Sequence, residues 1–393
     1  MSQFQVNAIS DLAGANGNAI TLASDGKCAI TGSTITADTG KFTNLPNRNI
    51  IICGAMNIAQ RGTSSTTSGY STVDRWNNQW SGTDENCTQA QVDVTSNDPG
   101  PWEKGFRKAL RITNGNQTSG AGAADYMRIY QAIEAQNLAS SGWDYTSASS
   151  YITLSFWVKS SVAQTFYGYL LSSDGTSQRY AFSTGALSAD TWTKVTKTIP
   201  GNSNLQIDND TGVGMYLFIH PFAGTDTTAS GVSLTGWAAH DTSARMPDNT
   251  STWWTTNDAT FELTGVQLEV SDYATEFDFR SYGEELRRCQ RYFHNSREGE
   301  PFGVAGYKSG SEIIGVHWFP VSMRDGPNIT GSSFEIRIDG GGRLQNGSGT
   351  LSGVRTGLNS YQYKLGGFSG LSSGDGAYTC AHNGGTVEFS AEI

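Results

Sequence analysis

The sequence of 393 residues has little cysteine, proline or charge, and it has no long hydrophobic run. Its five cysteines are widely scattered and form no C-x-x-C pair, which argues against a disulfide framework and a structural zinc site. We expect free, mostly buried thiols, as in a protein made in a reducing cytoplasm. Apolar runs such as residues 50–53 and 215–219 are too short to span a membrane. The first residues lack the basic start and apolar stretch of a signal peptide.

Charged residues make up only 16% of the chain, against about 25% in a typical soluble domain. The net charge is −10, so the chain is acidic overall. Nucleic acids and anionic lipids attract basic surfaces, and we therefore expect neither as a partner. The acidity itself mainly predicts solubility.

Glycine and aromatic residues are abundant, with 47 glycines and 11% aromatics. This composition indicates many short strands joined by small-residue turns. Ile152, Leu154, Phe156 and Val158 alternate with more polar residues, the period of a half-buried strand. Eight or nine such strands recur over residues 47–272, without the alternating helices of a parallel sheet. The sequence therefore predicts an all-β fold, an antiparallel jelly-roll β-sandwich.

The sequence of this region also predicts three local features, namely a short strand, a possible helix and a bulge. Residues 50–52 read as a short buried strand, and residues 126–139 are compatible with a helix. The apolar phase also changes within one strand, at Gly265. A bulge at this glycine would return five apolar side chains to the core. These are Phe261, Leu263, Val266, Leu268 and Val270.

The chain divides into four predicted segments. Residues 1–46 are small and polar, with too few hydrophobic residues for a core, and read as an N-terminal arm. Residues 47–280 form the jelly roll, residues 281–293 a short linking helix, and residues 294–393 a C-terminal β-sandwich of five strands. Because the arm would gain a core only by association, we expect a homo-oligomer, in particular a homotrimer.

The linking helix has both a start signal and an apolar stripe. Ser281 and Glu284 have the spacing of a capping box. The expected buried stripe is Tyr282, Leu286, Cys289 and Phe293. Acidic residues near its start and basic residues near its end suit the helix dipole.

Several segments together resemble a family of fibre-like structural proteins of tailed phages, abundant in marine phages. They are "NRNIIICGAMNIAQRGTS", "ITLSFWVKSS", "FELTGVQLEVSDYATEFDFRSYGEELRRCQRYF" and "VEFSAEI". The resemblance covers residues 47–393. It implies a virion component made in the host cytoplasm, with residues 1–46 as an anchoring arm that binds other tail or capsid proteins. The middle domain also resembles the jelly roll of carbohydrate-binding modules.

The sequence offers few signs of catalysis. Its carboxylate pairs are those of any acidic protein, and its five histidines form no H-x-H or H-x-x-x-H pair. One G-x-S-x-G motif surrounds Ser372, but its flanks are Gly/Ser loop rather than a strand and a helix. We therefore expect no enzyme and no cofactor.

Asp208 and Asp210 alternate in a turn, as at the start of a calcium loop. The twelfth loop position, where such loops have glutamate, is Ile219. A structural calcium ion held by ligands from separate loops stays open as an alternative.

Aromatic side chains outnumber what the core of short strands needs, so some should contact a glycan or another subunit. The adjacent Trp253 and Trp254 would face opposite ways on a strand, leaving one exposed. The full set of candidates is Trp157, Tyr167, Tyr169, Trp192, Trp253 and Trp254.

Three functions fit these observations. The first is a tail fibre or receptor-binding protein that attaches to the host surface, where a glycan could be bound. The second is a capsid decoration or head-fibre protein. The third is a polysaccharide depolymerase, which the sparse catalytic signals disfavour.

Overall fold

A computed structural model of the chain describes residues 48–296, 300–338, 342–346, 350–381 and 384–393. The predicted arm of residues 1–46 lies outside the described residues. The described chain is all-β, as the sequence predicts: its strands pair antiparallel, and its helices are α1 (Ala135–Ala139), α2 (Thr252–Thr255) and α3 (Tyr282–Gln290). No helix in this part of the chain is both long and apolar enough to cross a bilayer.

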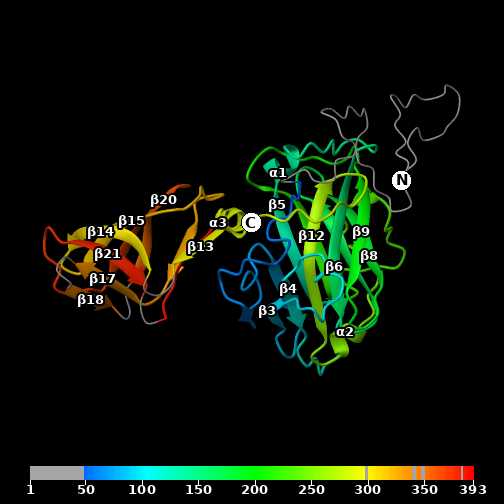
Figure 1. Cartoon of the computed structure of the whole chain (residues 1–393), viewed down its shortest axis with the longest axis horizontal. Coiled ribbons are helices and arrows are strands. Elements are labelled where there is room, and N and C mark those ends of the chain that lie inside the picture. Colours follow the sequence, from blue (N-terminus) through cyan, green and yellow to red (C-terminus); the bar gives the residue numbers. More distant parts are fainter. Residues whose placement is uncertain (1–47, 297–299, 339–341, 347–349, 382–383) are drawn as a thin grey trace, which may run out of the picture. The chain divides into compact units, whose positions relative to one another are not determined.

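The first sandwich contains two six-stranded sheets, named here sheet A and sheet B (Figure 1). In spatial order, sheet A consists of β1 (Ser64–Ser65), β3 (Thr88–Asp93), β4 (Lys108–Thr113), β12 (Thr260–Val270), β6 (Tyr151–Ser160) and β9 (Thr193–Pro200). Sheet B consists of β11 (Trp237–Ala239), β8 (Gln178–Ala186), β7 (Thr165–Ser172), β10 (Val213–Ala223), β5 (Tyr126–Glu134) and β2 (Asn77–Ser81).

The core of this sandwich lies between the two sheets. The predicted alternation in β6 is confirmed, because Ile152, Leu154, Phe156 and Val158 are all 0% exposed. From the opposite sheet, β10 contributes every second side chain of its first half, such as Leu217. The other side chains of each strand lie on the two outer faces, where they are available for other roles.

The predicted bulge in β12 is present at Gly265, which has a φ of +63°. The pairing of β12 with β6 shifts register between Thr264 and Gln267. Glycine adopts this backbone conformation more readily than any other residue, and a Cβ there would lie 2.6 Å from the ring of Phe106. Of the five side chains predicted to return to the core, four do; Val270 is 37% exposed, because β12 ends there.

Two local predictions are wrong. Residues 50–52 are not a strand, although Ile51 and Ile52 are buried. The side chain of Gln131 takes the place of a neighbouring strand there: the Ile52 N–H donates to its Oε1 at 2.9 Å, and its Nε2 donates to the Ile52 carbonyl at 2.8 Å. The segment 126–139 is not one helix, because β5 occupies most of it and α1 only its end.

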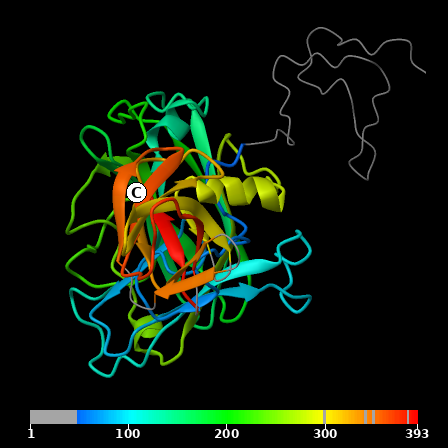
Figure 2. The ribbon, with the colours of Figure 1, turned by 90° about the vertical axis from the view of Figure 1, so that its left-hand side faces the viewer.

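Helix α3 starts with the predicted cap, and Figure 2 shows it as a single coil. The Glu284 N–H donates to Ser281 Oγ at 3.3 Å. The predicted apolar stripe is wrong at Tyr282, which is 65% exposed. Glu285 is buried instead, because its carboxylate accepts from the Cys53 N–H and pairs with Arg280.

The second sandwich has two further sheets. A three-stranded sheet contains β13 (Phe293–Ser296), β22 (Val387–Ser390) and β16 (Asn328–Gly331). A seven-stranded sheet contains β18 (Gly342–Asn346), β17 (Phe334–Ile338), β21 (Gly376–Ala381), β14 (Pro301–Ser309), β15 (Glu312–Trp318), β20 (Ser360–Gly366) and β19 (Leu351–Thr356). A separate core includes Phe302, Tyr363 and Phe389. The sequence predicted five strands here, fewer than the two sheets contain.

The residues after β22 connect to the first sandwich through charged groups. Glu392 forms ion pairs with Arg75 and, at 3.2 Å, with Arg61. The Tyr70 hydroxyl donates to the Ile393 carbonyl at 2.8 Å. Arg75 is 1% exposed, and its buried charge is therefore balanced by a carboxylate.

The four cysteines in the described residues are buried free thiols, namely Cys53, Cys87, Cys289 and Cys380.

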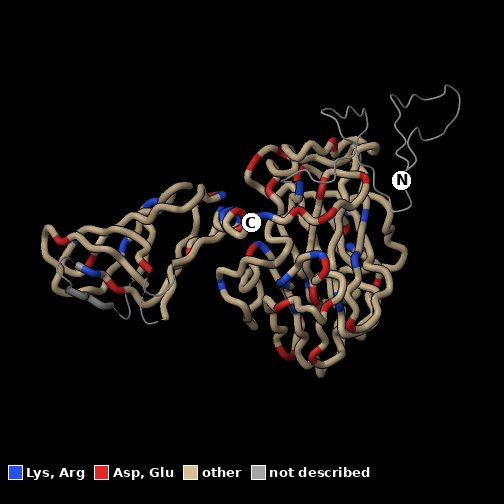
Figure 3. Tube along the Cα trace, in the orientation of Figure 1, with Lys and Arg blue, Asp and Glu red and all other residues tan. Residues whose placement is uncertain are grey.

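Acidic and basic residues are interspersed along the chain rather than gathered by sign (Figure 3).

Candidate functional site

Two of the six predicted aromatic candidates belong to the core. Trp253 and Trp254 are both 0% exposed, so neither can contact a glycan. The prediction failed because it placed them on a strand, whereas they lie on the single turn of α2. Their indole N–H groups donate to backbone carbonyls, Trp253 to Thr260 at 3.1 Å and Trp254 to Gly120 at 2.8 Å.

Trp157 and Trp192 lie on the outer face of sheet A, which segment 94–107 covers. We call this surface the closed face. Trp192 is 8% exposed and packs with Val94 and Ala109, while the half-buried Trp157 packs against the same cluster. Trp157 also lies against Gly100, where a Cβ would be 2.6 Å from its ring. These indoles therefore hold a loop onto the sheet.

Two strand cations of the closed face, Lys159 and Arg111, are paired with carboxylates. Lys159 pairs with Asp98 at 2.9 Å and with Glu262 at 3.2 Å, and Arg111 pairs with Glu262 at 2.8 Å. The Trp192 indole also donates to Asp98 at 2.9 Å. Although burial acts to raise it, hydrogen bonds from Thr95, Trp192 and Lys159 hold the pKa of Asp98 well below its ordinary value. These two cations are therefore neutralised within the protein.

The outer face of sheet B differs. The register of three strands places Tyr130 on β5 opposite Phe218 on β10, and Phe218 opposite Tyr169 on β7. The ring centroids are 5.0 Å apart for the first pair and 4.8 Å for the second, which is stacked. Tyr216 continues the array, 5.4 Å from Phe218. We call this surface the tyrosine face; its tyrosines are Tyr126, Tyr130, Tyr167, Tyr169 and Tyr216.

The tyrosines of the tyrosine face differ in how deeply they are buried. Tyr169 is 1% exposed, because segment 224–250 lies over it with Met246 and neighbouring side chains. Tyr126, Tyr130, Tyr167 and Tyr216 are half-buried. Rings fixed at one edge and open on the other offer rigid, partly apolar contact area to a ligand.

The predicted candidates Tyr167 and Tyr169 thus lie on this face, one half-buried and one buried. The sequence prediction missed Tyr126, Tyr130 and Tyr216. A signal was present, because Tyr126, Arg128 and Tyr130 alternate in "YMRIY", but the segment was interpreted as a possible helix.

Electrostatics on the tyrosine face are set by burial and by arginines. Burial raises the pKa of Tyr130 and of Tyr216, so both hydroxyls stay protonated at neutral pH. Burial, with the charges of Arg128 and Arg245, lowers the pKa of His220 well below its ordinary value. His220 is therefore neutral, and its ring stacks on Tyr169 at 5.6 Å.

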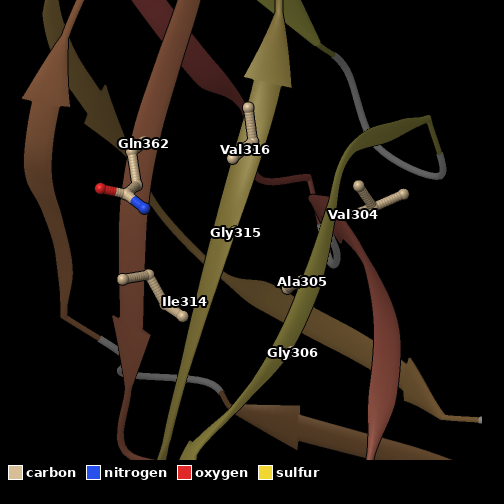
Figure 4. A pocket seen from close by; sticks show the side chains of 7 residues that line it. All are labelled: Val304, Ala305, Gly306, Ile314, Gly315, Val316 and Gln362. Atoms are coloured by element: carbon tan, nitrogen blue, oxygen red, sulfur yellow. The ribbon is translucent and has the colours of Figure 1, made fainter.

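The second sandwich carries a shallow groove of about 280 Å³ on its seven-stranded sheet (Figure 4). Its lining comes from β14, β15 and β20 and includes Val304, Gly306, Gly315 and Gln362. Val304 is 66% exposed. The groove offers one amide and no charged side chain.

Asp208 and Asp210 lie close to Asp174. The Asp208 N–H donates to Asp174 Oδ2 at 2.9 Å, and Asp210 Oδ1 accepts from Gly212 at 2.8 Å. Burial, with both neighbouring aspartates, raises the pKa of Asp174. No cluster of three or more His, Cys, Asp or Glu side chains in the described residues has metal-binding geometry. The calcium site stays a prediction.

Ser372 lies in a turn between β20 and β21, where its N–H donates to Asp375 Oδ2 at 2.7 Å, and no helix follows it. The strand–turn–helix context of a nucleophile elbow is missing at this described position.

No family profile matches the chain, and no curated protein matches its sequence. Among solved structures, the enzymatically active domain of tailspike protein 4 of bacteriophage CBA120 is similar at 11% identity and a TM-score of 0.30, covering 57% of this chain. This chain spans only 22% of that tailspike domain.

Two carbohydrate-binding modules are also similar. The N-terminal cellulose-binding domain of Cellulomonas fimi β-1,4-glucanase C has 13% identity and a TM-score of 0.27, and the match covers 55% of this chain and 98% of that domain. A family 11 carbohydrate-binding module from a cellulosomal cellulase of Clostridium thermocellum has 11% identity and a TM-score of 0.25, with 53% and 95% covered.

Proposed function

We propose that this protein is a carbohydrate-binding component of a phage virion, a tail fibre or receptor-binding protein, and that it binds host surface glycan on the tyrosine face. The observation that carries the proposal is the row of half-buried tyrosines on one outer sheet face. Apolar faces of sugar rings stack on such rings, and their hydroxyls reach the polar edge. The virion role depends on the sequence resemblance of residues 47–393 to fibre-like phage proteins.

Binding is tested with the full chain on immobilised bacterial surface polysaccharides. We expect Tyr216→Ala to weaken capture about tenfold, equivalent to roughly 1.4 kcal/mol, because one stacking ring is removed. Tyr282→Ala is the matched control, since it removes an exposed ring from α3, away from the tyrosine face. The proposed site is refuted if both variants lose the same amount of affinity for the polysaccharide. It is also refuted if the polysaccharide captures neither the parent protein nor the variants.

The virion role has its own test. Particles carrying an epitope tag after residue 393 are imaged with a labelled antibody, and we expect label at the tail. Label spread over the shell would support the capsid-decoration alternative instead. Absence of the chain from purified particles would refute both.

The proposal includes no catalysis. We expect no reducing ends to be released when the full chain is incubated with a polysaccharide that it binds.

The proposal also includes assembly as a homotrimer, with residues 1–46 attached to other virion proteins. A trimeric mass by light scattering at micromolar concentration supports this, and a stable monomer contradicts it.

A further inference from the structure

Three arginines gather on the tyrosine face. Arg128 lies on β5 between Tyr126 and Tyr130, with its guanidinium carbon 4.9 Å from the first ring centroid and 5.7 Å from the second. Arg179 on β8 and Arg245 in the covering segment both act electrostatically on Tyr169, as Arg128 does. The site therefore combines rings with positive charge in a protein whose net charge is −10.

These arginines form no ion pair with a carboxylate, unlike most of the buried or half-buried arginines that the structure describes. Elsewhere, buried or half-buried arginines are neutralised, as Arg75 is by Glu392 and Arg291 is by Glu134 at 2.8 Å. Within the described residues, no Asp or Glu oxygen lies within ion-pairing distance of Arg128, Arg179 or Arg245.

Neutral groups hold the guanidinium of Arg128 in place. Its Nε donates to Gln79 Oε1 at 3.0 Å, and its Nη2 donates to the same oxygen. Gln79 Nε2 in turn donates to the Tyr130 hydroxyl at 3.3 Å. An amide orients the guanidinium without cancelling its charge, so the cation is positioned in advance and Nη1 is left available.

Arg179 is oriented in a similar way. It is 6% exposed, its Nη1 donates to the Arg245 carbonyl at 2.9 Å, and its Nε has no hydrogen-bond partner in the described structure. The Nε of Arg245 also lacks one. The charge of Asp241 acts on Arg179 without forming an ion pair with it, so the desolvated cation is only partly balanced. A bound anion nearby would lower the cost of burying that charge.

We propose that the glycan bound on the tyrosine face is acidic, a polysaccharide with carboxylate or sulfate groups, and that Arg128 binds the acidic group. This inference rests on the proposed carbohydrate-binding function. Residues two apart on a strand are roughly 6.6 Å apart, so a sugar ring stacked on Tyr126 or Tyr130 places a ring substituent within reach of Arg128. The planar guanidinium can hold a carboxylate or sulfate through paired hydrogen bonds.

The test uses pairs of polysaccharides that differ only in charge. Polygalacturonate and its carboxyl-reduced form make one pair, and a sulfated galactan and its desulfated form make the other. Binding of the full chain is measured by biolayer interferometry at 50 and 500 mM NaCl. We expect at least tenfold tighter binding to the acidic member of at least one pair, and a marked loss at high salt because the ion pairs are screened.

Variants identify the residue responsible. Arg128→Gln should remove most of the preference for the acidic member, and Arg128→Lys should keep part of it, because the charge remains and the paired geometry is lost. Arg107→Gln is the matched control: Arg107 also lies over an aromatic ring, 3.7 Å from the Trp102 centroid, but on the closed face. Unchanged melting temperatures confirm that the variants fold.

The outcomes separate the two proposals. Equal binding to both members of a pair, or preference for the neutral member, overturns the acidic ligand and leaves carbohydrate binding intact. An acidic preference that survives Arg128→Gln overturns the role of Arg128. Capture of no member of either pair counts against the acidic ligand, whereas capture of other, neutral polysaccharides would still support the proposed function.

Discussion

The two outer faces of the first sandwich use the same residue types in opposite ways. On the closed face, the indole of Trp192 is buried beneath segment 94–107 and bonded to Asp98. On the tyrosine face, Tyr130 and Tyr216 are half-buried, and their rings meet in a T-shaped arrangement with centroids 6.0 Å apart. Aromatic content alone therefore does not distinguish the two faces; partial exposure of the rings on a rigid sheet marks the tyrosine face as the candidate surface.

The charges follow the same division. Lys159 and Arg111 of the closed face share the carboxylate of Glu262, whereas Arg128 of the tyrosine face is held by an amide. A cation whose neighbours neutralise it stabilises the fold, and one whose neighbours only orient it is available to a ligand. The comparison predicts that substitutions on the closed face change stability and that those on the tyrosine face change binding.

The largest effect is expected on the closed face. Trp192→Ala should lower the free energy of unfolding by about 3 kcal/mol, because it removes a buried ring, a hydrogen bond to Asp98 and a cation–π contact with Lys159. Urea unfolding of the full chain measures it. Glycan affinity should not change, and a loss of affinity in the folded variant would contradict the division between the faces.

The next effect depends on pH. Asp98 has a lowered pKa in the folded state, so its contribution to stability is present above the unfolded value of about 4 and is lost as the pH falls below it. Asp98→Asn should cost about 1–3 kcal/mol at pH 7. It should also flatten the decline in melting temperature between pH 4 and pH 2. An equally steep decline in the variant would show that another group is responsible.

On the tyrosine face, Tyr216→Ala should change stability less than Trp192→Ala does, because the ring is only half-buried. Its effect should appear in the dissociation constant for glycan, about tenfold. Titration calorimetry and urea unfolding on the same variant measure both quantities. A stability loss as large as that of Trp192→Ala would show that the tyrosine face is also a packing surface.

The smallest effect is expected in the second sandwich. Trp318 is 70% exposed and has no ring neighbour in the described residues. Trp318→Ala should change stability by less than about 0.5 kcal/mol and leave glycan affinity unchanged. A clear loss of affinity would show that a single exposed ring is sufficient for binding and would place a second site on this sandwich.

Much of the fold could be predicted because strand periodicity is local. The alternation of Ile152, Leu154 and Phe156 specifies the inner face of β6, and the phase change at Gly265 specifies a bulge. The cap of α3 could also be predicted from Ser281 and Glu284, since a cap depends on residues three apart.

The site could be predicted only in part, because it depends on contacts between distant strands. Tyr130 meets Phe218 across the β5–β10 pairing, and Phe218 meets Tyr169 across the β10–β7 pairing, neither of which local periodicity specifies. Burial was equally non-local: Trp254 is covered by the loop that carries Gly120, and Tyr282 stays exposed because Glu285 occupies the inner side of α3. Sequence patterns identified the residue types, and strand pairing decided which of them share a surface.

The amide of Gln79 lies at a position where one substitution would change the charge of the tyrosine face. Replacing that amide by a carboxylate, as in Gln79→Glu, would place a permanent counter-ion beside Arg128. This carboxylate would compete with the acidic group of a sugar for the guanidinium. Neither the stacked rings nor the strand register would need to alter. Under the proposed function, a change in ligand preference would thus arise from a one-residue difference that leaves the architecture untouched.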